Sequence, residues 1–202
     1  MAALAWCAAA NAQMVSDSGC NLEMRNAFDP FDYRTATDEQ RQIVEINHFN
    51  GAVENLIRGI TGPIGGDLDY TLRVFPNHPR ALMSMAKLAR REGKARPTGS
   101  HYTADCWFER ALTFQPDDPE VRLVYGIDLL RDNKAPQAIE QMLIAEKLMG
   151  APDPNVAYNL GLAYFEMKDY EQALKRAQQA YSLGFPLPGL RDKLQRAGQW
   201  HE

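Results

Sequence analysis

The sequence has few of the residues and motifs by which catalytic and metal sites are usually recognised. It contains four histidines and three cysteines among 202 residues, and the histidines do not follow a metal-binding spacing such as HExxH. It also lacks a GxSxG turn, a phosphate-binding loop and a GxGxxG motif. We therefore expect no catalytic residue, no metal ligand and no cofactor, and we predict that the chain is not an enzyme.

A concentration of positive charge is missing as well. The formal net charge is −4, and the 22 lysines and arginines form no long basic run. Because binding to nucleic acid phosphates requires clustered positive charge, no nucleic acid partner is expected. Hydrophobic residues make up 45% of the chain and charged residues 24%, which is ordinary for a globular domain.

The apolar run at the N-terminus is short, from Ala2 to Ala10. It could not cross a bilayer as a helix, so no stable membrane span is expected. It ends in Ala10-Asn11-Ala12, a small-residue pattern typical of signal peptide cleavage. We predict that residues 1–12 are a signal peptide cleaved after Ala12, and that the mature protein is periplasmic or secreted. Because no positive charge precedes the run, a cytoplasmic protein is the alternative.

The cysteines depend on this prediction. Cys7 would leave with the signal peptide, and the mature chain would keep Cys20 and Cys106. Two cysteines in an oxidising compartment favour a disulfide, which would tie the N-terminal segment to a position 86 residues further along. The alternative is two unpaired thiols.

A period of about 35 residues runs through the second half of the chain. Three pairs of identical residues are each separated by 35 positions: Pro119 and Pro154, Gly126 and Gly161, and Ala138 and Ala173. Each unit has the pattern of two amphipathic helices joined by a tight turn. Asp118-Pro119 and Asp153-Pro154 supply helix starts, since a carboxylate caps free backbone N–H groups and proline suits the first turn. An earlier unit contains about six inserted residues within the loop sequence REGKARPTGSH.

This pattern resembles the tetratricopeptide repeat (TPR) family. The last unit is the most similar, because it has the family's leucine-glycine pair, tyrosine and two alanines at Leu160-Gly161, Tyr164, Ala173 and Ala180. The middle unit keeps Gly126, Ala138 and Ala145, and the first keeps Ala104, Phe108, Ala111 and Pro116. The resemblance covers residues 79–186.

The resemblance implies an all-α fold, an α-solenoid of about three TPR helix pairs. The pairs are expected at residues 79–118, 119–153 and 154–186. A degenerate helical unit at 50–78 would precede them, and a capping helix with a tail at 187–202 would follow. Residues 13–49 are expected to form an irregular N-terminal segment.

The stretch from Gly65 to Leu82 is rich in chemically active side chains. Aligned with the following unit, its apolar residues Leu68, Leu72 and Phe75 form a buried stripe, and His78 occupies a helix start. On this interpretation Asp67, Asp69 and Arg73 mainly point outward or cap. The alternative is a small acid–base or metal site in the Asp67–His78 region, formed by Asp67, Asp69, His48, His78 and His101.

TPR solenoids present a concave groove lined mainly by the first helix of each unit. The resemblance implies groove positions in all three units: Met83, Lys87, Arg90 and Arg91, then Leu123, Ile127 and Leu130, and finally Tyr158, Asn159, Leu162 and Phe165. The groove would have a basic end and an apolar floor. It would suit a peptide with an acidic group and apolar anchors.

Three aromatic residues lie close together in the N-terminal segment, namely Phe28, Phe31 and Tyr33. Because exposed aromatic clusters are unfavourable in water, we predict that this segment folds back onto the repeats and is held there by the Cys20–Cys106 bond. The groove is one position that it could occupy. Exposure for partner binding is the alternative.

The sequence thus predicts a non-enzymatic scaffold or adaptor of the cell envelope that binds a protein or peptide in its groove. The alternative is an enzyme accessory, or a small-molecule or metal binder, that uses the Asp67–His78 region. Neither interpretation fixes the oligomeric state.

Overall fold

The computed structural model describes residues 15, 16, 18–24 and 29–201 of the chain. Within these residues all regular secondary structure is helical, apart from a single β-bridge between Val15 and Asn21. The helices are α1 (Asp38–His48), α2 (Gly51–Glu54), α3 (Ile64–Val74), α4 (Pro79–Glu92), α5 (Ala104–Phe114), α6 (Pro119–Arg131), α7 (Ala135–Met149), α8 (Pro154–Glu166), α9 (Tyr170–Ser182) and α10 (Gly189–Arg196). The all-α prediction is confirmed.

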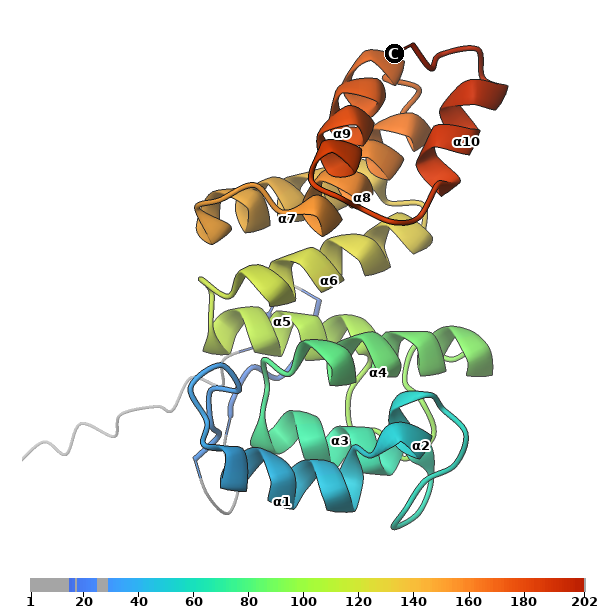
Figure 1. Ribbon diagram of the computed structural model, residues 1–202. Helices are drawn as coiled ribbons and strands as arrows, with labels where there is room; N and C mark the ends of the chain where they lie inside the picture. The colour runs from blue at the N-terminus through green and yellow to red at the C-terminus, as the bar shows by residue number, and fades with distance from the viewer. Residues whose placement is uncertain (1–14, 17, 25–28, 202) are drawn as a thin grey trace, which may run out of the picture.

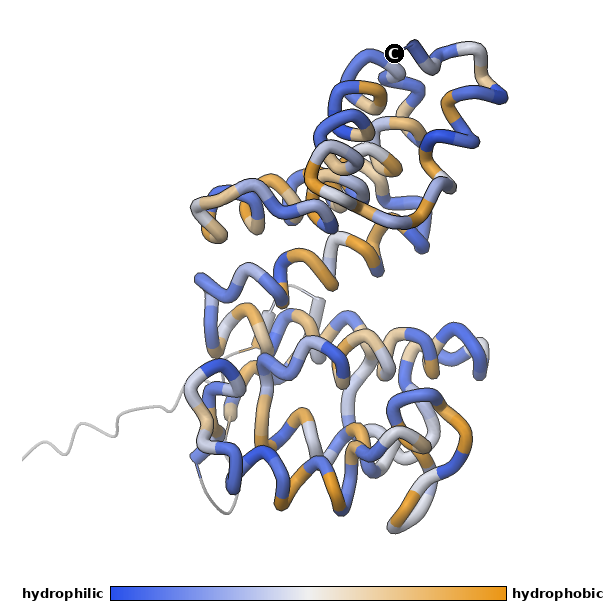
Figure 2. The backbone as a smooth tube through the Cα atoms, viewed as in Figure 1, coloured by the Kyte–Doolittle hydropathy of each residue, from blue (hydrophilic) through white to orange (hydrophobic). Residues whose placement is uncertain are grey.

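Consecutive helices pack as pairs, and the pairs stack from α1 at one end to α10 at the other (Figure 1). The most extensive contacts are between α6 and α7 and between α8 and α9. Apolar and polar residues alternate in short stretches along most helices (Figure 2), as expected when one face of a helix is buried. The arrangement is a TPR-like α-solenoid with a capping helix.

The predicted helix starts are present. Asp118 and Asp153 each accept backbone hydrogen bonds at the beginning of α6 and α8, and proline follows both. At the start of α4 the same role falls to His78, whose Nδ1 accepts from the backbone N–H of Ala81 at 3.3 Å. An unprotonated imidazole nitrogen therefore replaces the carboxylate at this turn.

Small residues allow the helices of a pair to approach closely. Ala138, Ala173 and Ala177 have no exposed surface. A Cβ atom on Gly161 would lie 2.5 Å from Cδ2 of Leu190, and one on Gly126 would lie 2.7 Å from Cγ of Met142. Both distances are too short for unshifted atoms, so these glycines set the spacing between helices.

The N-terminal segment is more ordered than the sequence pattern predicted. Residues 13–49 were expected to be irregular, and this is wrong for α1. Thr37 and Gln40 form a reciprocal capping box at its start, and Val44 is buried against α3. The degenerate first unit is therefore built from α1, α2 and α3.

Among the helices of the described residues, none combines the length and apolar character needed to cross a bilayer. The predicted signal peptide at 1–12, with Cys7, lies outside the described residues, as does Phe28.

Candidate binding groove

The first helices of neighbouring units, α4 and α6, lie side by side and form an open cavity of about 430 Å³. Met83 and Lys87 of α4 line it, together with Leu123 of α6. We call this cavity the α4–α6 groove. It also includes Glu54, Glu120, Val124, Met149, Asp153 and Asn155, so part of its wall comes from α2 and from the corner between α7 and α8.

Two of the three cationic side chains at the expected basic end of the groove already contact other groups of the protein. Arg90 forms ion pairs with Asp128 and Asp132, and Arg91 donates a hydrogen bond to the carbonyl oxygen of Leu56. Lys87 is exposed and has no ion pair with the described residues. The prediction of a basic end that is free for a ligand is therefore wrong for two of its three charges.

Of the apolar residues expected in the middle of the groove, Leu123 lines the cavity, whereas Ile127 and Leu130 lie outside it. Leu123, Ile127 and Leu130 are half-buried and pack against the core formed by α6, α7 and α8.

The C-terminal third of the expected groove is covered by the protein's own capping helix. Tyr158 stacks on Phe185 with ring centroids 4.0 Å apart, and Nζ of Lys193 lies 5.2 Å from the ring centroid of Phe165. Leu162 and Phe165 pack with the fully buried Leu190. The expectation that Tyr158, Leu162 and Phe165 form an open groove floor is therefore wrong.

Asn159 was expected to offer its side-chain amide to a partner. Its Nδ2 instead donates to the carbonyl oxygen of Asn155 at 2.8 Å. One of its two N–H donors is thus used within α8, and the second N–H and the side-chain oxygen remain.

The N-terminal segment contacts the repeats, as predicted, but at their turns and outside the α4–α6 groove. The backbone N–H of Phe31 donates to the carbonyl oxygen of Val74 at 2.9 Å. The ring of Tyr33 lies against Phe75, with centroids 5.6 Å apart, and stacks on His78 at 4.0 Å. We call residues 29–36 the N-terminal strap.

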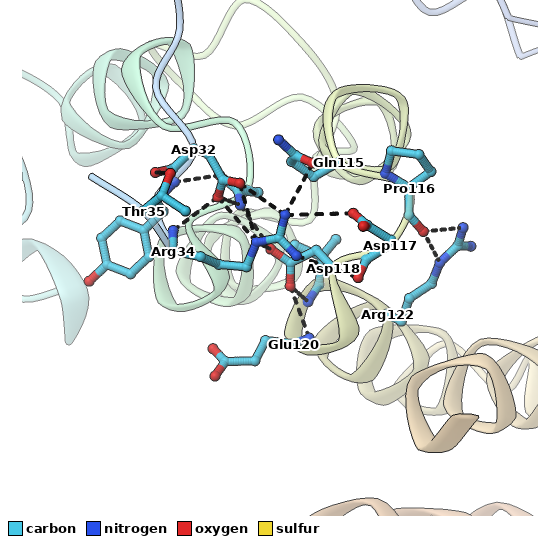
Figure 3. Close-up of polar contacts among 12 residues, drawn as sticks. Asp32, Arg34, Thr35, Gln115, Pro116, Asp117, Asp118, Glu120 and Arg122 are labelled. Atoms are coloured by element: carbon cyan, nitrogen blue, oxygen red, sulfur yellow. Dashed lines mark hydrogen bonds and ion pairs between the residues drawn. The ribbon is translucent and has the colours of Figure 1, made fainter. Parts of the chain in front are cut away.

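A polar network fixes the strap to two successive turns (Figure 3). Asn77 donates to Asp32 at 2.7 Å and to Asp118 at 2.8 Å. Arg34 donates to Asp32 at 2.9 Å and to Gln115 at 3.1 Å. Burial opposes ionisation of Asp32, but the hydrogen bonds from Arg34 and Asn77 outweigh it and lower its pKa. The strap therefore links the turn before α4 to the turn before α6.

The predicted disulfide between Cys20 and Cys106 is present. One turn further along α5, Arg110 donates to the carbonyl oxygens of Asn21 and Glu23. Its guanidinium also lies over the ring of Tyr102, 4.4 Å from the centroid. Burial lowers the pKa of Arg110. The segment before the strap is thus held to α5 by a covalent bond and by a buried arginine.

Asp67, one residue of the alternative acid–base site, is buried, although it was expected to point outward or cap. It accepts hydrogen bonds from the backbone of Ile60 and the hydroxyl of Thr61, both at 2.6 Å, and from Nδ1 of His48 at 3.1 Å. Burial opposes its ionisation, but the hydrogen bonds from Thr61 and Ile60 outweigh that effect and lower its pKa. Asp67 therefore fastens the loop between α2 and α3.

Asp69 is also buried, against the same expectation. It accepts from the backbone and the Nδ1 of His101 at 2.7 and 2.9 Å, and from Nε of Arg73 at 3.0 Å. The third histidine, His78, faces Glu45 of α1 with 3.4 Å between Nε2 and Oε1. The three histidines thus pair with three different carboxylates and do not converge on one centre.

Among the described residues, one group of acidic side chains comes close enough to share a cation: Asp105, Asp128 and Asp132. Arg90 already binds two of these carboxylates. Arg90 therefore supplies the positive charge that a bound cation would otherwise bring to these carboxylates.

Comparison with known proteins agrees with a TPR-like helical fold. No family model matches the sequence. The human Protein O-mannosyl-transferase TMTC3 is 29% identical over 107 residues, which are 53% of this chain and 11% of that protein. The chain thus spans about a tenth of TMTC3, and the transferase activity in that name is not carried over.

A solved structure, from the functional characterization of Pseudomonas aeruginosa pilF, has a similar fold. The TM-score is 0.56, and 22% of residues are identical over 80% of this chain and 69% of that one. This likeness extends beyond the three repeats to most of the described helices. It concerns the fold alone.

Sequence reasoning missed several groove residues. Glu120 and Val124 lie within three residues of the predicted Leu123 on the same helix, so helical spacing could have identified them. Met149 belongs to a second helix, and Glu54 belongs to the short helix α2. Groove positions carried over from the first helices could not have included them.

Proposed function

We propose that this protein is a non-enzymatic scaffold or adaptor that binds a protein or peptide partner in the α4–α6 groove. One observation carries the proposal. Between two adjacent first helices, the chain leaves open a cavity of about 430 Å³ with an apolar floor that includes Met83, Leu123 and Val124. Concave sites of this size are typical of ligand recognition, and helical solenoids offer such surfaces to other chains.

The three separate histidine–carboxylate pairs support this choice over the alternative. His48 and His101 each hold a buried aspartate of α3, and His78 caps α4. These contacts account for the polar side chains of the Asp67–His78 region as parts of the fold. We therefore place the function in the groove.

A site-specific crosslinking experiment tests the proposal. A photoreactive phenylalanine analogue is introduced at Lys87 in the groove and, as a control, at Glu140, an exposed position on α7. We expect a partner adduct from position 87 that is absent from position 140 and is lost when Leu123→Asp is added. Identical adducts from both positions, or an adduct that Leu123→Asp leaves unchanged, would contradict the proposal.

We propose further that the protein acts in the cell envelope or outside the cell. The support is the disulfide between Cys20 and Cys106, since such bonds persist in oxidising compartments. Intact-mass measurement of the protein from its source cells tests this, because export with cleavage after Ala12 gives a chain that begins at Gln13. A chain that retains residues 1–12 and carries free thiols would contradict it.

A further inference from the structure

Most charged side chains that line the α4–α6 groove are already engaged by other groups of the protein. Arg80 pairs with Glu54 at 3.0 Å and with Glu45 at 3.2 Å. Asp153 accepts the backbone N–H groups of Asn155 and Val156 at the start of α8. These groups have hydrogen-bonding partners before any ligand arrives, and so they contribute little charge selectivity.

Two of the charged side chains that line the groove are not engaged in this way. Lys87 and Glu120 line the cavity, both are exposed, and neither side chain has an ion pair within the described part of the chain. They have opposite signs and stand on different helices. A ligand can therefore gain from each of them without breaking an existing contact.

The positions of these charges relative to the apolar floor follow from helix geometry. Lys87 is four residues beyond Met83 on α4, and Glu120 is three residues before Leu123 on α6. Pro79 at the start of α4 and Glu120 at the start of α6 line the same cavity, so the two helices begin together. At 1.5 Å per residue, the charges lie about 10 Å apart along the helix direction, on opposite sides of the Met83–Leu123 pair.

The apolar part of the cavity suits a flexible anchor. Met83 and Met149 both line it, with Leu123 and Val124 between them. Methionine side chains adapt to irregular apolar shapes. The cavity can therefore hold a leucine, methionine or phenylalanine side chain, whichever the ligand offers.

We infer that the α4–α6 groove binds an extended peptide with a central apolar residue flanked by an acidic residue, which faces Lys87, and a basic residue, which faces Glu120. The inference rests on the proposed function and narrows its partner to this charge pattern. An extended chain rises about 3.3 Å per residue, so the two charged residues are roughly two to four positions apart. For a peptide that runs in the same direction, the opposite charge order places like charges together and is rejected.

A displayed random-peptide library, panned against the full chain, tests the inference. The wild-type chain is compared with Lys87→Glu, with Glu120→Lys and with the double variant. We expect the wild type to enrich an acidic–apolar–basic pattern and the double variant to enrich the reversed charges. The enriched peptide is then synthesised, and its affinity for Lys87→Glu is expected to fall roughly three- to fivefold and to recover when the peptide's acidic residue is replaced by lysine.

Two outcomes separate this inference from the proposed function. If all four chains enrich one pattern, and Leu123→Asp abolishes binding, the groove binds peptides but the charge assignment is overturned. If the enriched peptides bind Leu123→Asp as well as the wild type, the inference is overturned, and the crosslinking at position 87 still decides the proposed function. Met83→Asp serves as a second groove variant, and circular dichroism checks that each variant folds.

Discussion

The phenol ring of Tyr33 stacks on the imidazole of His78, with ring centroids 4.0 Å apart. Phe49 closes the other side at 4.6 Å, and the histidine has no exposed surface. The strap, α1 and α4 therefore meet at one buried imidazole. Its protonation state bears on the stability of the whole N-terminal unit.

Acid is expected to loosen this junction. Burial lowers the pKa of His78 below its usual 6.5, although Glu45 opposes the shift. The folded state thus binds a proton less readily than the unfolded state, so the stabilisation is present above pH 6.5 and is lost as the pH falls below it. The other charged or titratable groups around the imidazole are Tyr33, Arg80 and Glu54. Urea unfolding measured from pH 7.5 to 5 gives the slope.

His78→Asn tests the origin of this slope, since asparagine can cap α4 without titrating. The slope between pH 6.5 and 5 should flatten in this variant and stay unchanged in the exposed control His201→Asn. A second loss is expected below pH 4.5, because hydrogen bonding to His78 lowers the pKa of Glu45 to about 2. An unchanged slope in His78→Asn would show that other groups cause the first loss.

Asn77→Ala should destabilise the strap. Asn77 is fully buried and donates to both Asp32 and Asp118, so its removal leaves two carboxylates without this donor. We expect the free energy of unfolding to fall by about 1–3 kcal/mol, as measured by urea titration. Arg58→Ala, at an exposed position in the α2–α3 loop, is the control and should stay within about 0.5 kcal/mol. Equal effects of the two substitutions would refute the role of Asn77.

Loss of the disulfide should have a larger effect. The bond joins residues 86 positions apart, and chain-entropy arguments assign about 4 kcal/mol to a loop of this length. The double variant Cys20→Ser with Cys106→Ser is therefore expected to melt at a lower temperature in calorimetry. Deletion of residues 13–36 should lower it further because the strap contacts are lost as well. Unchanged thermal stability after the deletion would count against the strap as a structural element.

Gly161→Ala should destabilise the capping helix. The new Cβ would lie 2.5 Å from Cδ2 of the fully buried Leu190, so either this side chain or α10 as a whole must shift. We expect a loss of about 1–3 kcal/mol, larger than the gain of about 1 kcal/mol from the better helix former. Gly66→Ala is the matched control, because its Cβ would meet its nearest neighbour at 3.8 Å. If both substitutions stabilise the protein, the close approach of α10 does not matter energetically.

The repeat half of the fold was predictable because its signals are local and periodic. Asp118, Asp153 and Gly161 have their roles within one repeat or next to it, so spacing reveals them. The capping box of Thr37 and Gln40 was equally local, and α1 was missed because no repeat of the period covers it.

The sequence could not predict which groove side chains are paired or covered by the protein itself, and the reason is physical. Arg90 is paired with Asp128, which is 38 positions away, and Tyr158 is covered by Phe185 and α10. Such pairings depend on the distance between stacked units, and the length of the sequence repeat does not specify that distance. Asp67 and Asp69 were misjudged likewise, since most of their partners, including Thr61 and His101, lie outside α3.

The position of α10 determines where a further repeat unit could be added without loss of its contacts. It packs on α8 and α9, so a unit added after Ser182 would compete with it for the same surface. Duplication of residues 119–153 in place would keep both ends, because the strap contacts Gln115 and Asp118 upstream and α10 contacts the last pair downstream. Lengthening by internal duplication of this unit is therefore compatible with the contacts at both ends.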